Sequence, residues 1–314
     1  MNTRKSLDGT AISLMLVLCL IWALQQIVLK HTADDISPMF QIALRSGVAA
    51  MLLALFMRWR GERMSFSDGT AGPGVLAATL FALEFCLVGE GLRHTSAAHM
   101  VVFLYTAPIF AALGLHFTRP EERLAPLQWL GIVLAFGGLA IAFFTRQQGT
   151  GPAPGNVLWG DFLGLLAGAF WGATTVVVRT SRLSHAPASQ TLMYQLLGAF
   201  AILTVFSMLT GQAHFNPTPT VWASLAFHSI GVAFLSFLLW FWLLRQYMAS
   251  RLGVFSFLTP LFGILLGAWL LDERIEPSFL MGSIPVLMGI VLVSGHGWIS
   301  ATLAKLARKR RPAA

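Results

Sequence analysis

The sequence predicts an all-α integral membrane protein whose ten transmembrane helices form two inverted five-helix repeats. Three observations predict this class: an apolar composition, ten apolar stretches of membrane-spanning length, and motifs that recur in the second half of the chain. The 314 residues are 56% hydrophobic and 11% charged, with a mean hydropathy of +0.71. Soluble proteins carry about 25% charged residues, so this composition excludes a soluble globular protein.

The positive charge and the two cysteines do not change this prediction. The formal net charge is +8, but the basic residues are scattered between apolar runs rather than gathered on one polar face, so no nucleic-acid partner is expected. Cys19 and Cys86 each lie inside an apolar stretch and lack the spacing of a metal site or a disulfide framework. We therefore expect neither a metal nor a cofactor.

A bilayer core requires about 20 mostly apolar residues per helix. The sequence supplies ten such stretches, at 11–29, 38–57, 73–92, 96–117, 127–145, 158–178, 188–209, 221–244, 252–271 and 279–298. The first follows Arg4 and Lys5 as a signal peptide would, but it is long enough to span and lacks a small-residue cleavage site. We expect it to be retained.

The lysines and arginines predict the orientation, because short cytoplasmic loops hold an excess of them. With the N-terminus inside, sixteen of the 21 lie in cytoplasmic segments, Arg45 lies inside a span, and four lie on the other side: Lys30, Arg93, Arg146 and Arg274. Both termini are therefore expected in the cytoplasm. The basic residues of 305–311 are expected to anchor the tail near anionic headgroups.

The chain divides into a first repeat (1–146), a linker rich in glycine and proline (147–157), a second repeat (158–299) and a basic tail (300–314). At an offset of 149, Trp22 matches Trp171 and Lys30 matches Arg179. At an offset of 151, the block Glu122-Arg123-Leu124-Ala125-Pro126 with Gly131 and Gly138 matches Glu273-Arg274-Ile275-Glu276-Pro277 with Gly282 and Gly289. Five spans per repeat require the second repeat to be inverted.

Pro108 and Pro260 lie in equivalent spans, 152 residues apart. Each is about 12–16 Å from a membrane face at 1.5 Å per residue, which is near the bilayer centre. Inverted repeats with paired breaks near the midplane are typical of secondary transporters with alternating access. The alternative is that both prolines are kinks tolerated within packed helices.

The segments around Trp22 and Trp171, the two Glu-Arg-x-x-Pro-x4-Gly blocks and the ten-span plan resemble the EamA family of the drug/metabolite transporter superfamily. The resemblance covers about Ser13 to Ser294, and one difference is Ala23, where the family often has glycine as at Gly172. It implies a multi-pass carrier of the bacterial cytoplasmic membrane that exports amino acids, including aromatic or amphipathic ones, or related metabolites. A nucleotide-sugar, lipid-precursor or drug transporter of the same superfamily remains the alternative.

Arg45 and Glu84 lie in spans two and three at a similar depth of about 10–12 Å. Ionisable groups inside the membrane indicate function by default. In one hypothesis, Arg45 holds a substrate carboxylate through its planar guanidinium and Glu84 takes up a coupling proton. In the other, the two form a structural salt bridge that allows both charges to be buried.

Other polar and aromatic residues are weaker candidates for the substrate site. They are Gln25, Gln41, Tyr194 and His228, which could bind substrate or bond neighbouring helices, and Trp22 and Trp171, which could line the cavity or pack in the core. His99 is interpreted as a packing histidine, and Glu90 as a solvated charge beside Arg93. Asp161 is interpreted as the N-cap of span six.

Gly160, Gly164, Gly168 and Gly172 recur every four residues in span six, which predicts a smooth stripe for close helix approach. Gly164 and Gly168, with Pro108 and Pro260, are the candidates for gating, and static tight packing is the alternative.

Two other classes of membrane protein fit less well. The sequence has no His-Glu-x-x-His or Gly-x-Ser-x-Gly motif, as some membrane-embedded enzymes would have. A passive channel would show a polar face along several spans, whereas the polar residues here are isolated. We therefore expect a non-enzymatic carrier that works in the lipid bilayer on a small-molecule substrate, as a monomer or a homodimer.

Overall fold

The computed structural model is all-α throughout the residues that it describes, which are 8–65, 68–144, 156–247, 255–256 and 258–309. No residue in these ranges belongs to a β-strand, and Ile36 and Phe215 form an isolated bridge. Long apolar helices dominate, so the predicted class of all-α membrane protein is confirmed.

Helices occupy all ten predicted positions. Eight are long and apolar enough to cross a membrane: α1 (Gly9–His31), α2 (Pro38–Trp59), α3 (Ala71–Gly91), α4 with α5 (Ala97–Leu104 and Ala107–Thr118), α7 (Val157–Thr180), α8 (Ala188–Leu209), α9 with η3 and α10 (Pro219–Ala226, Phe227–Ser236 and Phe237–Gln246), and α13 (Pro277–Lys309). The apolar stretches of α6 (Pro126–Phe144) and α12 (Leu258–Leu270) are shorter. Two 3₁₀ turns, η1 (Pro120–Glu122) and η2 (Arg182–Ser184), follow α5 and α7.

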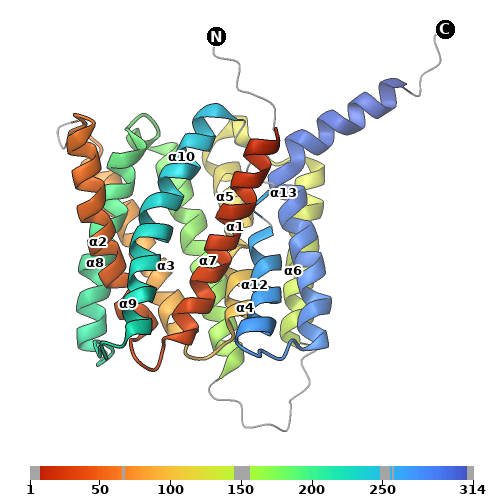
Figure 1. Cartoon of the computed structure of the whole chain (residues 1–314). Coiled ribbons are helices and arrows are strands. Elements are labelled where there is room, and N and C mark those ends of the chain that lie inside the picture. The colour runs from red at the N-terminus through yellow and green to blue at the C-terminus, as the bar shows by residue number, and fades with distance from the viewer. Residues whose placement is uncertain (1–7, 66–67, 145–155, 248–254, 257, 310–314) are drawn as a thin grey trace.

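Two predicted boundaries fall at or beyond the limits of the description. The linker predicted at 147–157 lies outside the described residues except for its last two positions. The tail predicted from residue 300 is not separate from span ten, because α13 continues as one helix to Lys309. Residues such as Leu, Ala and Lys in this segment favour helix, and α13 leaves the bundle there (Figure 1).

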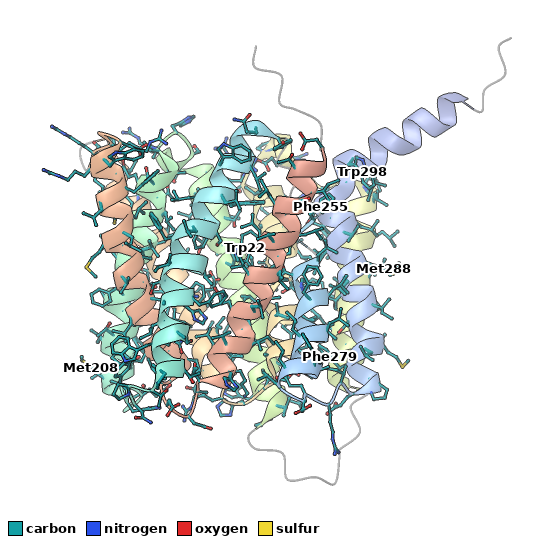
Figure 2. The ribbon with its side chains drawn as sticks, in the orientation of Figure 1. Trp22, Met208, Phe255, Phe279, Met288 and Trp298 are labelled. Atoms are coloured by element: carbon teal, nitrogen blue, oxygen red, sulfur yellow. The ribbon has the colours of Figure 1, made fainter. Side chains whose placement is uncertain are left out.

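The helices form one upright bundle, and the two halves of the chain run in opposite directions (Figure 1). We call the end where α1 begins the near end and the end where α1 finishes the far end. The helix α7 begins at the far end, so it runs opposite to α1, as the odd number of spans per repeat predicts. Trp22 lies deep in the bundle, whereas Met208 and Met288 project from its sides and are 64% and 53% exposed (Figure 2).

The packing of α6 against α13 depends on four glycines that the sequence repeat relates. A Cβ atom on Gly131 would lie 2.9 Å from the carbonyl oxygen of Gly289, and one on Gly138 would meet the carbonyl oxygen of Gly282. Gly131 is the repeat equivalent of Gly282, and Gly138 of Gly289. Gly131 therefore contacts the repeat equivalent of Gly138, and Gly138 contacts the repeat equivalent of Gly131. Two antiparallel helices related by a two-fold axis produce this pattern.

The glycine stripe of α7 packs directly on α4 and α5, which confirms the predicted close approach. A Cβ on Gly168 would lie 2.7 Å from Thr106 Oγ1, and one on Gly164 would lie 3.2 Å from Phe103 Cβ. Small residues at such positions allow helix backbones to approach closely. The contact is shown, and a gating role for Gly164 and Gly168 stays a prediction.

Spans four and eight are irregular in the described residues. Span four breaks between α4 and α5 at Tyr105 and Thr106, immediately before Pro108, and the Thr106 hydroxyl donates to the carbonyl of Phe103 (2.6 Å). In span nine, Pro260 lies in the first turn of α12, and much of the chain just before it is outside the described residues. Span eight, expected as one regular helix, contains the ten-residue π-helix η3. Such segments are frequent at functional sites.

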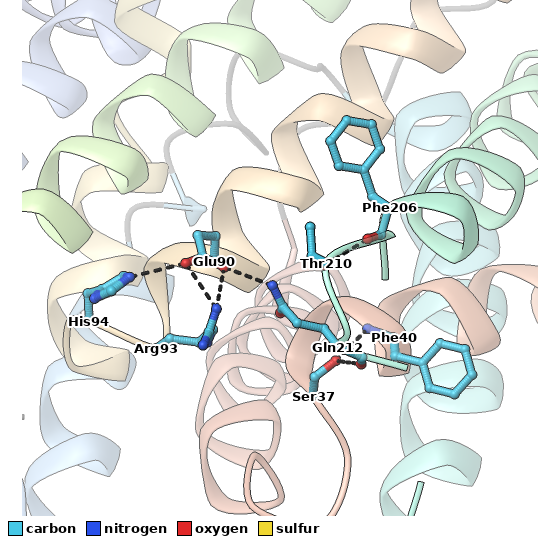
Figure 3. A network of polar contacts seen from close by, with 8 residues as sticks. All are labelled: Ser37, Phe40, Glu90, Arg93, His94, Phe206, Thr210 and Gln212. Carbon is cyan, nitrogen blue, oxygen red and sulfur yellow. Dashed lines mark hydrogen bonds and ion pairs between the residues drawn. The ribbon is translucent and has the colours of Figure 1, made fainter. Parts of the chain in front are cut away.

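A polar network at the far end joins the ends of three helices (Figure 3). Glu90, at the end of α3, accepts from Arg93 (2.9 Å) and from the side-chain amide of Gln212 (3.1 Å). The hydroxyl of Ser37, which caps α2, donates to the backbone carbonyl of Gln212 (2.5 Å). The predicted Glu90–Arg93 contact is thus present. It forms part of a connection between α2, α3 and the segment after α8.

We expect Gly138→Leu to destabilise the protein strongly and Gly137→Leu to have little effect. A side chain at 138 would collide with the backbone of α13, where the amide nitrogen of Val286 is 2.9 Å from the ideal Cβ, whereas nothing lies within 4 Å of a Cβ at 137. Overpacking of this kind costs about 1–3 kcal/mol or more. The thermal unfolding of the two purified variants in one detergent measures the difference, and equal melting temperatures would contradict the close contact of α6 and α13.

Candidate functional site

A buried polar network connects α1, α2, α9 and η3 in the interior of the bundle. Its members are Gln25, Thr32, Gln41, Arg45, Ser224 and His228. Gln41 and Arg45 are four residues apart on α2, and Ser224 and His228 are four residues apart across α9 and η3. Side chains at this spacing share one helix face, so each pair points toward the same neighbours.

Gln41 is the centre of this network. Its Oε1 accepts from the hydroxyl of Thr32 (2.8 Å), and its Nε2 lies 3.1 Å from Nδ1 of His228 and within hydrogen-bond reach of Ser224 Oγ. On the other side of the imidazole, His228 Nε2 lies 3.2 Å from the backbone carbonyl of Gln25. His228 Nδ1 also lies 2.8 Å from the backbone carbonyl oxygen of Ser224, so each ring nitrogen has a carbonyl acceptor within hydrogen-bond distance.

Arg45 connects this network to the acidic residue of span three. Its Nη1 donates to Oε1 of Gln25 (2.7 Å), and its guanidinium carbon lies 4.7 Å from the ring centre of Phe85. Arg45 and Glu84 interact electrostatically, but no ion pair within 4.0 Å joins these two described residues. The direct salt bridge considered from the sequence is therefore not formed here, and Arg45 is held by a glutamine and an aromatic face.

Glu84 is the feature of the site that most requires explanation. It is 4% exposed, and its Oε2 has no hydrogen-bond partner. The side-chain oxygen of Gln26, on α1, is also buried without a partner. Buried polar atoms normally have partners because leaving them unpaired is costly. Both oxygens can accept a hydrogen bond from a bound molecule, and the Glu84 carboxylate can also take up a proton.

The remaining sequence-predicted residues lie around the network or away from it. Trp171 packs edge-on against Tyr105 (5.3 Å between ring centres) in the apolar cluster that contains Phe85. The indole of Trp22 donates to Ser236 Oγ in η3 (3.0 Å). Tyr194 is not part of the network, because it packs over Gly74 with its hydroxyl 3.4 Å from Thr70 Oγ1.

A second buried cluster shows that one interpretation was wrong. Asp161 is not the N-cap of α7, because Asn156 caps that helix by accepting from the amide of Trp159. Asp161 instead binds His99 Nδ1 (2.9 Å) and the hydroxyl of Thr95, and so joins α7 to α4. The His99 ring also stacks on Phe279 (3.7 Å between centres), which agrees with its interpretation as a packing residue.

Sequence analysis missed Thr32 and Ser224 as members of the network. Ser224 precedes His228 by four residues, so the helical spacing could have identified it. Thr32 follows α1 as its C-cap, and no sequence signal places its hydroxyl on Gln41.

The network is closed to both ends of the bundle in this structure, because its six side chains belong to residues that are at most 8% exposed. A recess of about 1090 Å³ lies elsewhere, along the side of the bundle between α2 and α8. Its walls are mostly apolar, with Arg58 and Arg63 at one end. The recess does not include the network residues, so access to Arg45 and Glu84 requires helices to move.

Comparisons with known proteins give one family. The model described as "EamA-like transporter family" matches residues 9–144 and 158–295. The chain is 24% identical over 281 residues to an uncharacterized transporter, YoaV, of Bacillus subtilis, covering 87% of this chain and 92% of that protein. It is 25% identical over 299 residues to a "Probable amino-acid metabolite efflux pump" of Escherichia coli, covering 92% and 96%. A solved structure titled "Crystal structure of protein" shares the fold, with a TM-score of 0.63 at 17% identity over 90% of this chain and 97% of that one.

We expect Gln41→Leu to destabilise the protein and Gln195→Leu, at a partly buried position of α8, to have a much smaller effect. Leucine at 41 leaves Thr32, Ser224 and His228 without their shared partner, at a cost of roughly 1–3 kcal/mol. Thermal unfolding measured by intrinsic fluorescence compares the two variants. A Gln41→Leu variant as stable as the Gln195→Leu variant would mean that these contacts contribute no stability.

Proposed function

The chain belongs to the EamA-like transporter family, and we propose that it is a secondary-active exporter of amino acids or related small metabolites that works by alternating access. Membership of the family and its multi-pass helical fold make it a membrane transporter rather than an enzyme. The proposal adds the cargo, the direction and the coupling.

One observation carries the proposal: a cation and an acid are buried next to each other inside an apolar bundle without neutralising each other directly. Charged side chains at this depth are costly and occur where they serve a substrate or ion pathway. Arg45 has partners that fix its position, whereas Glu84 Oε2 has none. A cation held in position beside an acid with an unpaired oxygen suits the binding of a zwitterion, which carries one negative and one positive group.

In this proposal the α-carboxylate of the cargo binds Arg45, and its amino group donates to Glu84 or Gln26. Among the described residues of the polar network, Arg45 is the one lysine or arginine, whereas a nucleotide-sugar or other phosphate cargo would favour several basic groups. The aromatic rings of Phe85, Tyr105 and Trp171 support an apolar or aromatic side chain on the cargo. The name of the Escherichia coli relative agrees with an amino-acid metabolite.

We further propose that Glu84 binds the coupling proton in exchange for cargo, and that the near end faces the bacterial cytoplasm. The excess of lysine and arginine in the loops of the near end supports this orientation. In this proposal the segments 1–146 and 158–299 are the two inverted repeats. The candidate points of movement are Pro108, Pro260, Gly164 and Gly168. The partners are the small-molecule cargo and the bilayer, with no nucleic acid, in a monomer or homodimer.

Arg45→Gln should weaken transport of amino acids far more than transport of their amides. The variant removes the charge that holds the carboxylate, and a hydrogen bond to a charged group contributes about 1.5–3 kcal/mol, or roughly ten- to a hundredfold in affinity. Counterflow of labelled amino acids from proteoliposomes, competed by unlabelled acids or amides, measures this. Equal loss for acid and amide would remove Arg45 as the carboxylate site, and absence of counterflow for every amino acid in the wild-type protein would reject the cargo class.

Glu84→Gln should keep exchange of cargo but lose transport driven by a proton gradient. Glutamine fills the same space and cannot cycle between charged and neutral forms, so the step that couples to the proton is removed. Glu90→Gln, which changes an acid on the same helix but outside the buried network, is the matched control and should keep the gradient dependence. Unchanged gradient dependence in Glu84→Gln would exclude it as the proton site.

A further inference from the structure

Four charged residues outside the substrate site are related by the sequence repeat and lie where the two halves contact each other. Lys30 lies in the last turn of α1 and Arg179 in the last turn of α7, and they are equivalent at an offset of 149. Glu122 and Glu273 open the two Glu-Arg-x-x-Pro blocks and are equivalent at an offset of 151. Arg179 contacts Glu122 directly, whereas Lys30 and Glu273 bind the same segment between α3 and α4 from different halves of the chain. We refer to both sets as pairs because the repeat relates them.

The near-end pair is Arg179 with Glu122. Arg179 Nη2 donates to Glu122 Oε1 at 2.8 Å, and the backbone carbonyl of Arg179 accepts from Arg119 Nη2 at 3.0 Å. The end of α7, in the second half of the chain, is thereby tied to η1 and its preceding residue, in the first half. Both partners are accessible, with side chains 57% and 32% exposed.

The far-end pair is Lys30 with Glu273, and it encloses the turn between α3 and α4. Lys30 Nζ donates to the carbonyl of Thr95 (2.9 Å) and to that of Leu92, while the Glu273 carboxylate accepts from the amides of Ala97 (2.7 Å) and Ala98. A carboxylate at the start of a helix satisfies free amides there. Lys30 and Glu273 interact electrostatically through this arrangement without an ion pair within 4.0 Å between these described residues.

The two pairs differ in burial. Arg179 is exposed, whereas Lys30 and Glu273 are only partly accessible, and a Cβ at Gly267 would meet the carboxylate of Glu273. Both pairs are engaged in a structure whose polar network is closed to both ends. The arginines that follow the two glutamates, Arg123 and Arg274, are both exposed and make neither pair.

We propose that these pairs are the positioning residues of alternating access: Arg179–Glu122 holds the near end closed, Lys30–Glu273 holds the far end closed, and release of either pair opens its own end to the Arg45–Glu84 site. The role given to the pairs rests on the proposed transport function, whereas their positions and contacts do not. Because the pairs are repeat equivalents at opposite ends, weakening one must shift the protein in the opposite direction to weakening the other.

The test measures the opening of each end separately with spin-label pairs at exposed, repeat-equivalent positions. The near-end labels replace Arg123 and Thr180, and the far-end labels replace His31 and Arg274. Cys19 and Cys86, both buried, are changed to alanine. Double electron–electron resonance on the full-length protein in lipid nanodiscs gives the distance distribution at each end, and thermal unfolding shows which variants are folded.

Glu122→Gln should raise the population with a long near-end distance by about two- to fivefold, as the loss of an exposed ion pair allows, and should lower the far-end open population. Glu273→Gln should do the reverse, with a larger effect because its carboxylate is less accessible. Exchange of charges in Glu122→Arg with Arg179→Glu should restore the wild-type near-end distances, which a merely structural role would not require. If a glutamate variant does not fold, Arg179→Gln and Lys30→Gln test the same pairs from the other partner.

The inference is overturned if both glutamine variants open the same end, or if neither changes the distances at either end. These distances do not depend on the cargo. If the two glutamine variants shift the distances at the two ends in opposite directions but no amino acid shows counterflow, the proposed cargo is rejected and this inference is kept. If amino acids show counterflow but the distances do not shift in opposite directions, this inference is rejected and the cargo is kept.

Discussion

The contact between α6 and α13 fixes the relation of the two halves of the chain, and the other features of the protein depend on that relation. Gly131 meets Gly289 and Gly138 meets Gly282, so that two backbones approach with no side chain between them. Without a hydrophobic driving force between helices in lipid, such close packing is a main source of association. Because each contact joins non-equivalent glycines of the repeat, the two halves are related by a two-fold axis that passes between these helices.

Inside the bundle, one connected set of side-chain hydrogen bonds joins α1, α2, α9 and η3, and its Arg45 interacts electrostatically with Glu84, an acid with an unpaired oxygen. Within lipid, every buried donor and acceptor must find a protein partner, and Gln41, Gln25 and His228 do so through one connected set of contacts. Glu84 Oε2 does not. A structural role alone would favour complete satisfaction, so the incomplete pairing is the physical reason to treat this network as a binding site.

The sequence was sufficient for the features that depend on local pattern. Hydropathy located all ten helical positions, and Pro108 marked the break between α4 and α5. The four-residue spacings identified the α7 glycine stripe and placed Gln41 and Arg45 on one face of α2. The features that depend on the register between distant helices were not accessible in this way: the partner of Asp161 is His99 rather than its own helix start, and Tyr194 points away from Arg45 toward Thr70. The π-helix η3 contains no proline, so its sequence shows no sign of an irregular segment.

The kinds of contact between the halves indicate which parts of the bundle are able to move. The α6–α13 contact is made by backbone against backbone, so any displacement there loses packing along two whole helices, and it suits a fixed axis. Some contacts at the two ends of the bundle depend on single side chains: Arg179 pairs with Glu122 at the near end, and Glu273 accepts from the amides of Ala97 and Ala98 at the far end. Individual polar contacts of this kind are exchanged at low cost. The break at Thr106 and the π-helix η3 interrupt the regular i→i−4 hydrogen bonding of their spans. Bending at these two places therefore requires fewer such bonds to be lost. Bending at these two interruptions can therefore change the ends of the bundle while the backbone contacts of α6 with α13 are kept.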